Sequence, residues 1–135
     1  MTSGNSGLPL VKKLTLRDGM RVWFDAMPET VIDEIDEYAL ELRFVADPGR
    51  GIDAAHIFVT ERKALEAHLA ALRNQIALDG QIWVSWPKQA SAEPTDITED
   101  IIREVCLPLG LVDTKACDID DDWAGLKLVI RKELR

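Results

Sequence analysis

Residues 54–60, with the sequence AAHIFVT, form an almost unbroken apolar run. Such a run is typical of a strand covered on both faces, because a strand with one wet face alternates apolar and polar residues. Parallel sheets with a layer of helices on each side bury their strands in this way. The run therefore favours an α/β fold.

Further strand-like segments lie at residues 20–24, 40–45, 81–86, 111–119 and 123–132. The segment LELRFV, residues 40–45, alternates apolar and polar residues and is predicted to be an edge strand. Pro87 should end the strand before it, because proline has no N–H to donate to a neighbouring strand. The last two segments are separated only by the acidic turn Asp120-Asp121-Asp122. A turn this short joins antiparallel strands and is too short for a parallel crossover.

Helical patterns alternate with these strands. A short helix is predicted over residues 8–16, followed by a turn in which Gly19 supplies a positive φ. A second helix is predicted from Pro28, because proline is favourable at a first helical position. Its apolar face consists of Val31, Ile32, Ile35 and Tyr38.

The third and fourth helices carry the clearest start and stop signals. Thr60 is the expected N-cap of the third helix, and Gly80 is its expected C-cap. Asp96 and Glu99 form a capping-box-like start for the fourth helix, which should end near Gly110. The apolar stripes are Leu65, Leu69, Leu72 and Ile76 in the third helix, and Ile97, Ile101, Val105 and Leu109 in the fourth.

The resulting order is β-α-β-β-α-β-α-β-β. Helical crossovers imply a mostly parallel sheet with helices on both faces, and the final hairpin places an antiparallel strand near an edge. We therefore predict a three-layer, Rossmann-like α/β fold. A chain of 135 residues, 47% of them hydrophobic, fits one domain over residues 1–135. Residues 1–7, MTSGNSG, have the composition of a flexible arm.

Charge and cysteine content restrict the partners and the compartment. The formal net charge of −8 opposes binding to nucleic acid and to anionic membranes, so we expect neither partner. No apolar run approaches the roughly 20 residues that span a bilayer, and the N-terminus lacks the apolar segment of a signal peptide. Cys106 and Cys117 are then expected to be free thiols in a reducing cytoplasm.

Ligands of open α/β sheets bind beyond the carboxyl ends of the strands, where successive connections leave to opposite faces. If residues 20–24 form a central strand, this crevice lies between Asp25 and Thr60. Arg62, Ser85 and Lys88 are expected along the same rim. These five residues are the predicted ligand-binding residues, and a small anion would suit the two cations, the hydroxyls and the amides after Thr60.

The reactive side chains do not form a recognisable catalytic pattern. Ser85 lacks the G-x-S-x-G elbow of a nucleophilic serine, and no sequence signal marks His56 or His68 as its base. We therefore predict structural roles for them and no catalytic residue. Trp83 and Trp86 alternate to opposite faces of their strand and cannot form one aromatic clamp.

The acidic cluster of Asp118 and Asp120 to Asp122 offers carboxylate oxygens that suit a hard cation. It lacks the central glycine and the distal glutamate of an EF-hand loop. Aspartate is also common in turns for backbone reasons alone. We predict no metal site, with cation binding at the Asp120 to Asp122 turn as the open alternative.

The succession GMRVWF, AAHIFVT, GQIWVSWP and GLVD, followed by a hairpin, resembles a shortened class I methyltransferase fold. The resemblance implies a six-stranded sheet in the order 2-1-3-4-6-5 with an antiparallel sixth strand. It also implies a Gly-rich, cofactor-binding turn after the first strand. Here that turn reads DAMPE, and Pro28 and Glu29 oppose the close approach of an anionic ligand. We therefore expect no S-adenosylmethionine, NAD or FAD cofactor.

A closer resemblance covers almost the whole chain. The segments that carry it are SGLPLVKKL, GMRV, HIFVT, WVSWPK, PTDITEDIIREVCLPLGLVDTKACDID and WAGLKLVIRK. They are similar to a family of small bacterial proteins that is known only as a domain of unknown function. This resemblance implies no activity, substrate or catalytic residue.

Three functions are consistent with the sequence. The first is a non-catalytic cytoplasmic module that binds a small ligand or a protein, because a fold alone does not imply an activity. The second is a methyltransferase-like enzyme that uses S-adenosylmethionine, with Asp25 as the nearest substitute for an acidic residue at the cofactor rim. The third is an interaction protein that forms homo-oligomers through an exposed edge strand or through its leucine-rich helix.

Overall fold

The computed structural model describes residues 8–135, and the flexible arm predicted for residues 1–7 lies outside the described residues. Six strands form one sheet in the order β2-β1-β3-β4-β6-β5. Their bounds are Arg21–Asp25 (β1), Arg43–Phe44 (β2), Ile52–Phe58 (β3), Ile76–Pro87 (β4), Leu111–Asp118 (β5) and Trp123–Ile130 (β6). The first four strands pair in parallel, whereas β6 is antiparallel to both of its neighbours. The predicted strand order and the antiparallel sixth strand are confirmed.

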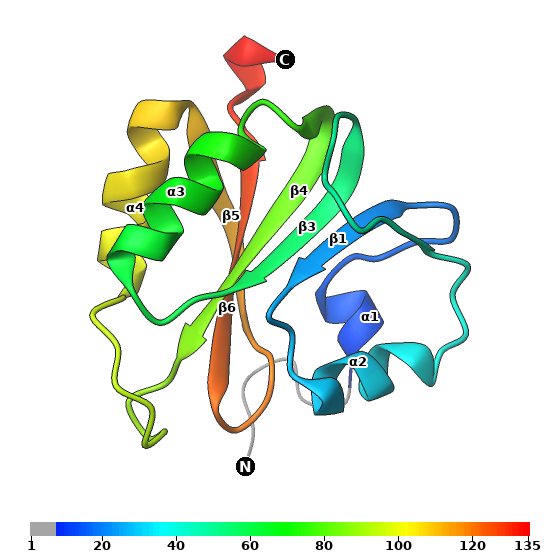
Figure 1. Ribbon diagram of the computed structural model, residues 1–135, viewed down its shortest axis with the longest axis horizontal. Coiled ribbons are helices and arrows are strands. Elements are labelled where there is room, and N and C mark those ends of the chain that lie inside the picture. The colour runs from blue at the N-terminus through cyan, green and yellow to red at the C-terminus, as the bar shows by residue number, and fades with distance from the viewer. Residues whose placement is uncertain (1–7) are drawn as a thin grey trace.

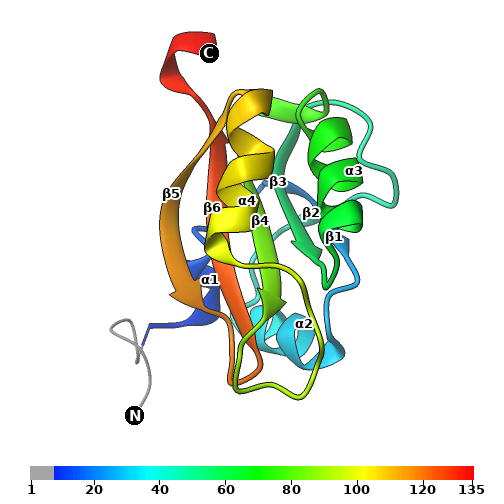
Figure 2. The same cartoon turned by 90° about the vertical axis from the view of Figure 1, so that its left-hand side faces the viewer.

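Helices cover both faces of the sheet (Figure 1). One face carries α3 (Arg62–Leu72) and α4 (Glu99–Cys106), and we call it the α3/α4 face. The other carries α1 (Leu10–Lys13) and α2 (Glu29–Asp36), and we call it the α1/α2 face. Two 3-10 turns, η1 (Leu107–Leu109) and η2 (Lys132–Leu134), complete the chain. Figure 2 shows the same sandwich from the side, so the predicted three-layer fold is confirmed.

Strand β3 is buried on both faces, as its apolar run predicted. Ala55 and Ile57 belong to the core under α3 and α4. Ala54 and Phe58 belong to the core under α1 and α2. Figure 1 shows β3 near the middle of the sheet, with β1 and β4 as its neighbours. The crevice predicted between Asp25 and Thr60 therefore lies between the carboxyl ends of the neighbouring strands β1 and β3.

The two tryptophans of β4 lie on opposite faces, as predicted. Trp83 is 1% exposed in the α1/α2 core, and its indole Nε1–H donates to the carbonyl oxygen of Leu14 at 3.0 Å. Trp86 is half-buried and packs against the α3/α4 core. Of these two tryptophans, only Trp86 therefore has a surface that a ligand can reach.

Two elements are shorter than predicted. The helix expected over residues 8–16 contains only Leu10–Lys13, because Thr15 adopts a left-handed φ of 53° that a helix cannot continue. The edge strand expected over residues 40–45 pairs with β1 only at Arg43 and Phe44. The turn at Gly19 has the predicted positive φ, 86°.

The predicted ends of the third helix are wrong. Its N-cap is Glu61 rather than Thr60, and the Glu61 side chain makes no capping hydrogen bond. The helix ends at Leu72, so Ile76 and Gly80 belong to β4. Gly80 is needed there because an added Cβ would lie 2.9 Å from the carbonyl oxygen of Ile52. The glycine marks a close approach of two strands and not a helix end.

The fourth helix begins two residues later than predicted. Thr98 is its N-cap, and the Thr98 hydroxyl accepts the N–H of Ile101. Its buried face is formed by Ile102, Val105 and Cys106, whereas the predicted stripe residue Ile101 is only half-buried. The stop at Gly110, with a φ of 82°, is confirmed.

Asp96 caps a different helix from the one predicted. Its Oδ1 accepts the N–H of Arg62 at 2.7 Å, and Arg62 is the first residue of α3. Asp96→Ala should therefore lower the free energy of unfolding by about 1 kcal/mol, the usual contribution of a capping side chain. Urea denaturation measures this loss. Asp121→Ala, in the exposed turn, is the matched control, and equal losses would contradict a capping role for Asp96.

The last hairpin contains an irregularity between Asp113 and Lys115. Asp113 points toward α4, where its Oδ2 accepts a hydrogen bond from Arg103. Lys115 instead lies toward α1, where its Nζ donates to the carbonyl oxygen of Lys13. In a regular strand, Asp113 and Lys115 would lie on the same face of the sheet. The extra residue of the bulge turns their side chains to opposite faces.

Both cysteines are buried and free. Cys106 lies in the core of the α3/α4 face and Cys117 in the core of the α1/α2 face, so the sheet separates them. Burial raises the pKa of the Cys106 thiol to about 11. Over residues 8–135 we find no helix with the length and apolar character that crossing a membrane requires.

Candidate functional site

The carboxyl end of β1 presents a contact between a carboxylate and an imidazole. Asp25 Oδ2 lies 3.1 Å from Nε2 of His68 on α3, and both side chains are partly exposed. The His68 ring also contacts the ring of Trp23, with 5.9 Å between centroids. Asp25 is thus at the predicted rim, and its carboxylate already has a partner from the neighbouring helix.

Thr60 and Arg62 lie at the start of α3, on the α3/α4 side of the rim. The carbonyl oxygen of Thr60 accepts the hydroxyl of Thr95 at 2.7 Å. The guanidinium of Arg62 pairs with Glu66 at 3.1 Å and with Glu104 at 3.6 Å. The hydrogen bond to Glu66 is the main cause that raises the pKa of Arg62. Arg62 therefore bridges α3 and α4 on the surface.

Ser85 does not reach the rim. It is 0% exposed, and its Oγ lies 2.7 Å from Nε2 of His56 on β3. Desolvation by burial lowers the pKa of His56 to about 3, so the imidazole is neutral at physiological pH. Its ring stacks on Phe58 at 4.5 Å between centroids. The serine and histidine resemble part of a nucleophilic pair, but both are buried on the α1/α2 face.

Lys88 follows the end of β4, as predicted, and is held by the acidic hairpin. Its Nζ lies 3.4 Å from Oδ1 of Asp118. Its backbone N–H donates to the carbonyl oxygen of Asp122 at 2.9 Å. Asp120 Oδ1 accepts the N–H groups of Asp122 and Trp123, which is a backbone reason for an aspartate in this turn. Within residues 8–135, no group of three potential ligands is arranged to hold a metal ion.

A pocket of about 450 Å³ opens beyond the carboxyl end of β4, and we call it the β4 pocket. It is lined by Trp86, Pro87, Lys88, Gln89, Ser91, Glu93, Thr95, Ile97, Thr98 and Glu99. A second pocket of about 440 Å³ is lined by Thr60, Glu61, Glu93, Pro94, Thr95 and Asp96. The two share Glu93 and Thr95, so the loop between β4 and α4 forms a wall of both.

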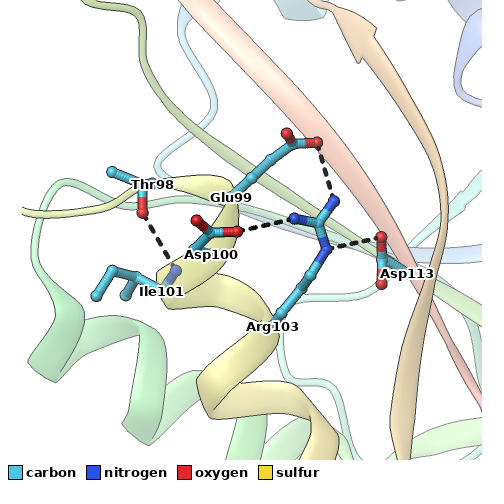
Figure 3. Close-up of polar contacts among 6 residues, drawn as sticks. All are labelled: Thr98, Glu99, Asp100, Ile101, Arg103 and Asp113. Atoms are coloured by element: carbon cyan, nitrogen blue, oxygen red, sulfur yellow. Dashed lines mark hydrogen bonds and ion pairs between the residues drawn. The ribbon is translucent and has the colours of Figure 1, made fainter.

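The start of α4 forms one wall of the β4 pocket, because Thr98 and Glu99 line it. Figure 3 shows Thr98 closing the first turn and Arg103 reaching three carboxylates. The guanidinium lies 3.1 Å from Asp113, 3.1 Å from Asp100 and 3.5 Å from Glu99. The hydrogen bond to Asp113 is the main cause that raises the pKa of Arg103. Because Asp113 belongs to β5, this ion-pair network fixes the start of α4 relative to the sheet.

The five predicted site residues do not converge on one pocket. Lys88 lines the β4 pocket and Thr60 the adjoining one, whereas Asp25, Arg62 and Ser85 line neither. Sequence reasoning missed Trp86, Thr95 and Thr98 as lining residues. The loop composition QASAEPTD and the capping threonine were available signals for the last two.

The turn after β1 does not fit the cofactor that a methyltransferase fold implies. Ala26 has a φ of 57°, and Pro28 occupies the N-cap position of α2 without an N–H. Glu29 places an acidic side chain in the first turn of α2. A helix start of this kind repels a carboxylate, such as that of the methionine portion of the cofactor, and lacks one of the amides that would bind it. The residues present are therefore a poor fit to S-adenosylmethionine at this turn.

The fold is nevertheless similar to solved methyltransferase structures. A S-adenosylmethionine-dependent methyltransferase from Aquifex aeolicus superposes with a TM-score of 0.62 at 10% identity, covering 90% of this chain and 88% of that one. A putative type 11 methyltransferase from Sulfolobus solfataricus gives 0.60 at 11% identity, covering 97% and 94%. Fibrillarin from Aeropyrum pernix, solved with bound S-adenosyl-L-methionine, gives 0.55 at 12% identity, covering 93% and 70%. At these identities the likeness establishes the fold alone.

Sequence comparison identifies the family. No functionally curated protein matches the chain significantly. Residues 22–132, which contain all six strands except the first residue of β1, match the model described as "Protein of unknown function (DUF3052)". The likeness to an uncharacterised family inferred from the sequence is confirmed. The chain belongs to the DUF3052 family, on a methyltransferase-like fold.

Proposed function

We propose that the protein is a non-catalytic, cytoplasmic module that binds a small ligand in the β4 pocket. The observation that carries this proposal is the pocket itself, about 450 Å³ beyond the carboxyl end of a central strand. Small-molecule sites have volumes of roughly 300 to 1,000 Å³ and combine apolar walls with a few polar groups. Open α/β sheets bind their ligands at this end.

The lining residues indicate the class of ligand. Trp86 offers a flat apolar surface, and Lys88 offers the cation of the lining. Glu93 and Glu99 also line the pocket, so a highly charged anion would be repelled. A compact ring compound with one hydrogen-bond acceptor suits this set. The ring would lie on Trp86 and the acceptor would face Lys88.

The absence of catalysis is proposed because the reactive groups at this end already have partners. Asp25 pairs with His68, and Lys88 pairs with Asp118. Ser85 and His56 are buried on the other face of the sheet. A general base must reach the proton that it removes, and these groups face one another instead.

A ligand in the β4 pocket should shift the indole N–H signal of Trp86 in ¹⁵N NMR spectra and leave that of buried Trp83 unchanged. We suggest titrating nucleosides, aromatic amino acids, nicotinamide and S-adenosylmethionine at millimolar concentrations. For any compound that shifts the Trp86 signal, Lys88→Ala should weaken binding about tenfold. This is the loss expected for a hydrogen bond to a charged group. Lys63→Ala, on the exposed side of α3, is the matched control.

Two results would contradict the proposal. One is that no compound in this set shifts Trp86, and the other is that Lys63→Ala and Lys88→Ala weaken binding equally. The alternative, a methyltransferase-like enzyme, is favoured by the solved structures that share the fold. Tight binding of S-adenosylmethionine that shifts the amides of Asp25, Ala26, Met27 and Glu29 would support that enzyme over a non-catalytic module.

The third function is assembly into homo-oligomers, for which the sequence suggests two surfaces. One of them, the leucine stripe of the third helix, is not exposed. The stripe of the leucine-rich helix is in the core, because Leu65 and Leu69 are 0% exposed and Leu72 is 1% exposed. That helix face cannot bind a second copy. An edge strand is the remaining candidate surface for such an assembly, and β5, with eight residues, is the longer of the two edges.

A further inference from the structure

Four cations gather on the α1/α2 face of a protein whose net charge is −8. Lys115 lies directly opposite Lys127 in the β5–β6 pairing, and Lys13 and Arg17 come from α1 and the segment after it. Like charges directly opposite one another destabilise a sheet. Among residues 8–135, none of the ion pairs includes any of these four. Within the described residues, the four cations therefore have no carboxylate at ion-pair distance.

Neutral oxygens hold the two opposed lysines in place. Lys115 Nζ donates to the carbonyl oxygen of Lys13 at 2.9 Å. Lys127 Nζ donates to Oγ1 of Thr15 at 3.2 Å. Desolvation by burial, and then the charges of Lys115 and Arg17, lower the pKa of Lys127. Each ammonium keeps unused N–H donors, because an ammonium has three.

A pocket of about 190 Å³ lies beside this cluster, at the amino end of the parallel strands, and we call it the Lys127 pocket. It is lined by Thr15, Arg17, Met20, Asp53, Asp79, Gly80, Gln81, Lys127 and Val129. Cations and carboxylates thus line the same hollow without pairing with each other. Asp53 is partly used, because its Oδ2 accepts the N–H of Arg21 at 2.9 Å.

The polar floor of the Lys127 pocket is fixed by a strained residue. Thr15 has a φ of 53°, which is unfavourable for a β-branched side chain. Its hydroxyl lies 2.6 Å from Oε1 of Gln81, a residue that is only 5% exposed. The Gln81 amide in turn donates to the carbonyl oxygen of Leu14 at 2.7 Å. Backbone strain of this kind persists where surrounding contacts demand it, often at binding sites.

We propose that the Lys127 pocket binds a small phosphate ester. A phosphate carries a charge of about −1.5 to −2 at pH 7 and would neutralise Lys127 and Arg17, with Lys115 close behind. Hydroxyl groups on the rest of the ligand would donate to Asp53 and Asp79. A volume of about 190 Å³ lies below the roughly 300 to 1,000 Å³ of common small-molecule sites, so it limits the ligand to a compact ester and excludes a dinucleotide. This site is at the opposite end of the sheet from the β4 pocket and does not depend on the function proposed there.

The test titrates inorganic phosphate and glycerol 1-phosphate into the ¹⁵N-labelled full chain at constant ionic strength. The amides of Thr15, Gln81 and Lys127 should shift, and the indole of Trp86 should not. Glycerol 1-phosphate should bind more tightly than inorganic phosphate, because only the ester has hydroxyls for Asp53 and Asp79. Binding of either compound should also raise the Tm, because a ligand of the folded state stabilises it.

Two variants make the test specific. Lys127→Gln should weaken the binding of both compounds about tenfold. In the absence of any anion, the same substitution should raise the Tm, because it relieves the repulsion between Lys127 and Lys115. Lys12→Gln removes the same charge from an exposed position of α1 and should leave both affinities unchanged. Equal weakening by the two variants would overturn the proposal, and so would shifts that map elsewhere. An ester that binds no more tightly than phosphate would overturn the assignment of Asp53 and Asp79.

Discussion

Trp83→Ala is expected to lower the free energy of unfolding by about 3 to 5 kcal/mol, the usual cost of emptying a buried aromatic site. Trp83 is 1% exposed and packs in the core of the α1/α2 face. Its indole N–H also ties β4 to the carbonyl oxygen of Leu14, just after α1. The substitution thus leaves a cavity and releases the short helix that covers it.

Guanidinium denaturation followed by far-UV circular dichroism measures this loss without relying on tryptophan fluorescence. Trp83→Phe keeps most of the volume and removes the donor, so a loss of about 1 to 2 kcal/mol is expected. Trp86→Ala is the control on the same strand, and it should cost less because Trp86 is half-buried. A Trp83→Ala loss no larger than that of Trp86→Ala would contradict the assigned packing.

The free energy of unfolding should fall as the pH falls from about 6.5 toward 3, and His56 should be a main cause. Burial lowers the folded-state pKa of His56 from 6.5 to about 3. Between these values the unfolded chain binds a proton that the folded protein excludes, so acid favours unfolding. The contribution of neutral His56 to the free energy of unfolding is fully present above pH 6.5. The greatest slope that one group can give is about 1.4 kcal/mol per pH unit.

Aspartates and glutamates also titrate in acid, so the comparison needs a matched variant. His56→Phe combined with Ser85→Ala removes both partners of the buried hydrogen bond, which avoids stranding one polar group. The ring at residue 56 can still stack on Phe58. Urea midpoints from pH 7 to pH 4 should fall less steeply for the double variant than for the wild type. Parallel curves would show that His56 does not remain neutral in the folded state.

The sequence predicts the sheet well because its signals are local. The apolar run in β3 and the short acidic turn before β6 each restrict topology without knowledge of the rest of the chain. The helix ends were less predictable. Asp96 caps α3 from a loop 34 residues away, and no local pattern around Thr60 reveals such a contact.

The candidate site was predicted only in part, because strand pairing decides which side chains meet. The position of Lys88 at the pocket can be predicted from Pro87 alone. Pro87 ends the strand, and this inference needs no knowledge of the neighbouring strands. Ser85 and His56 each stand alone in an apolar strand, so neither pattern marks a pair. Their contact follows only when β3 and β4 are aligned with both side chains on the α1/α2 face. Two isolated polar residues in neighbouring buried strands are then expected to satisfy each other.

The bulge makes one position of β5 tolerant of a change in chain length. Asp113 lies opposite Leu128 and Lys115 opposite Lys127, so Thr114 is the extra residue. Its loss would restore simple alternation and leave Lys115 and Cys117 on their present faces. Loss of a paired residue such as Ala116 would instead reverse the face of every side chain on one side of it. Deletion of Thr114 should therefore be tolerated better than deletion of Ala116.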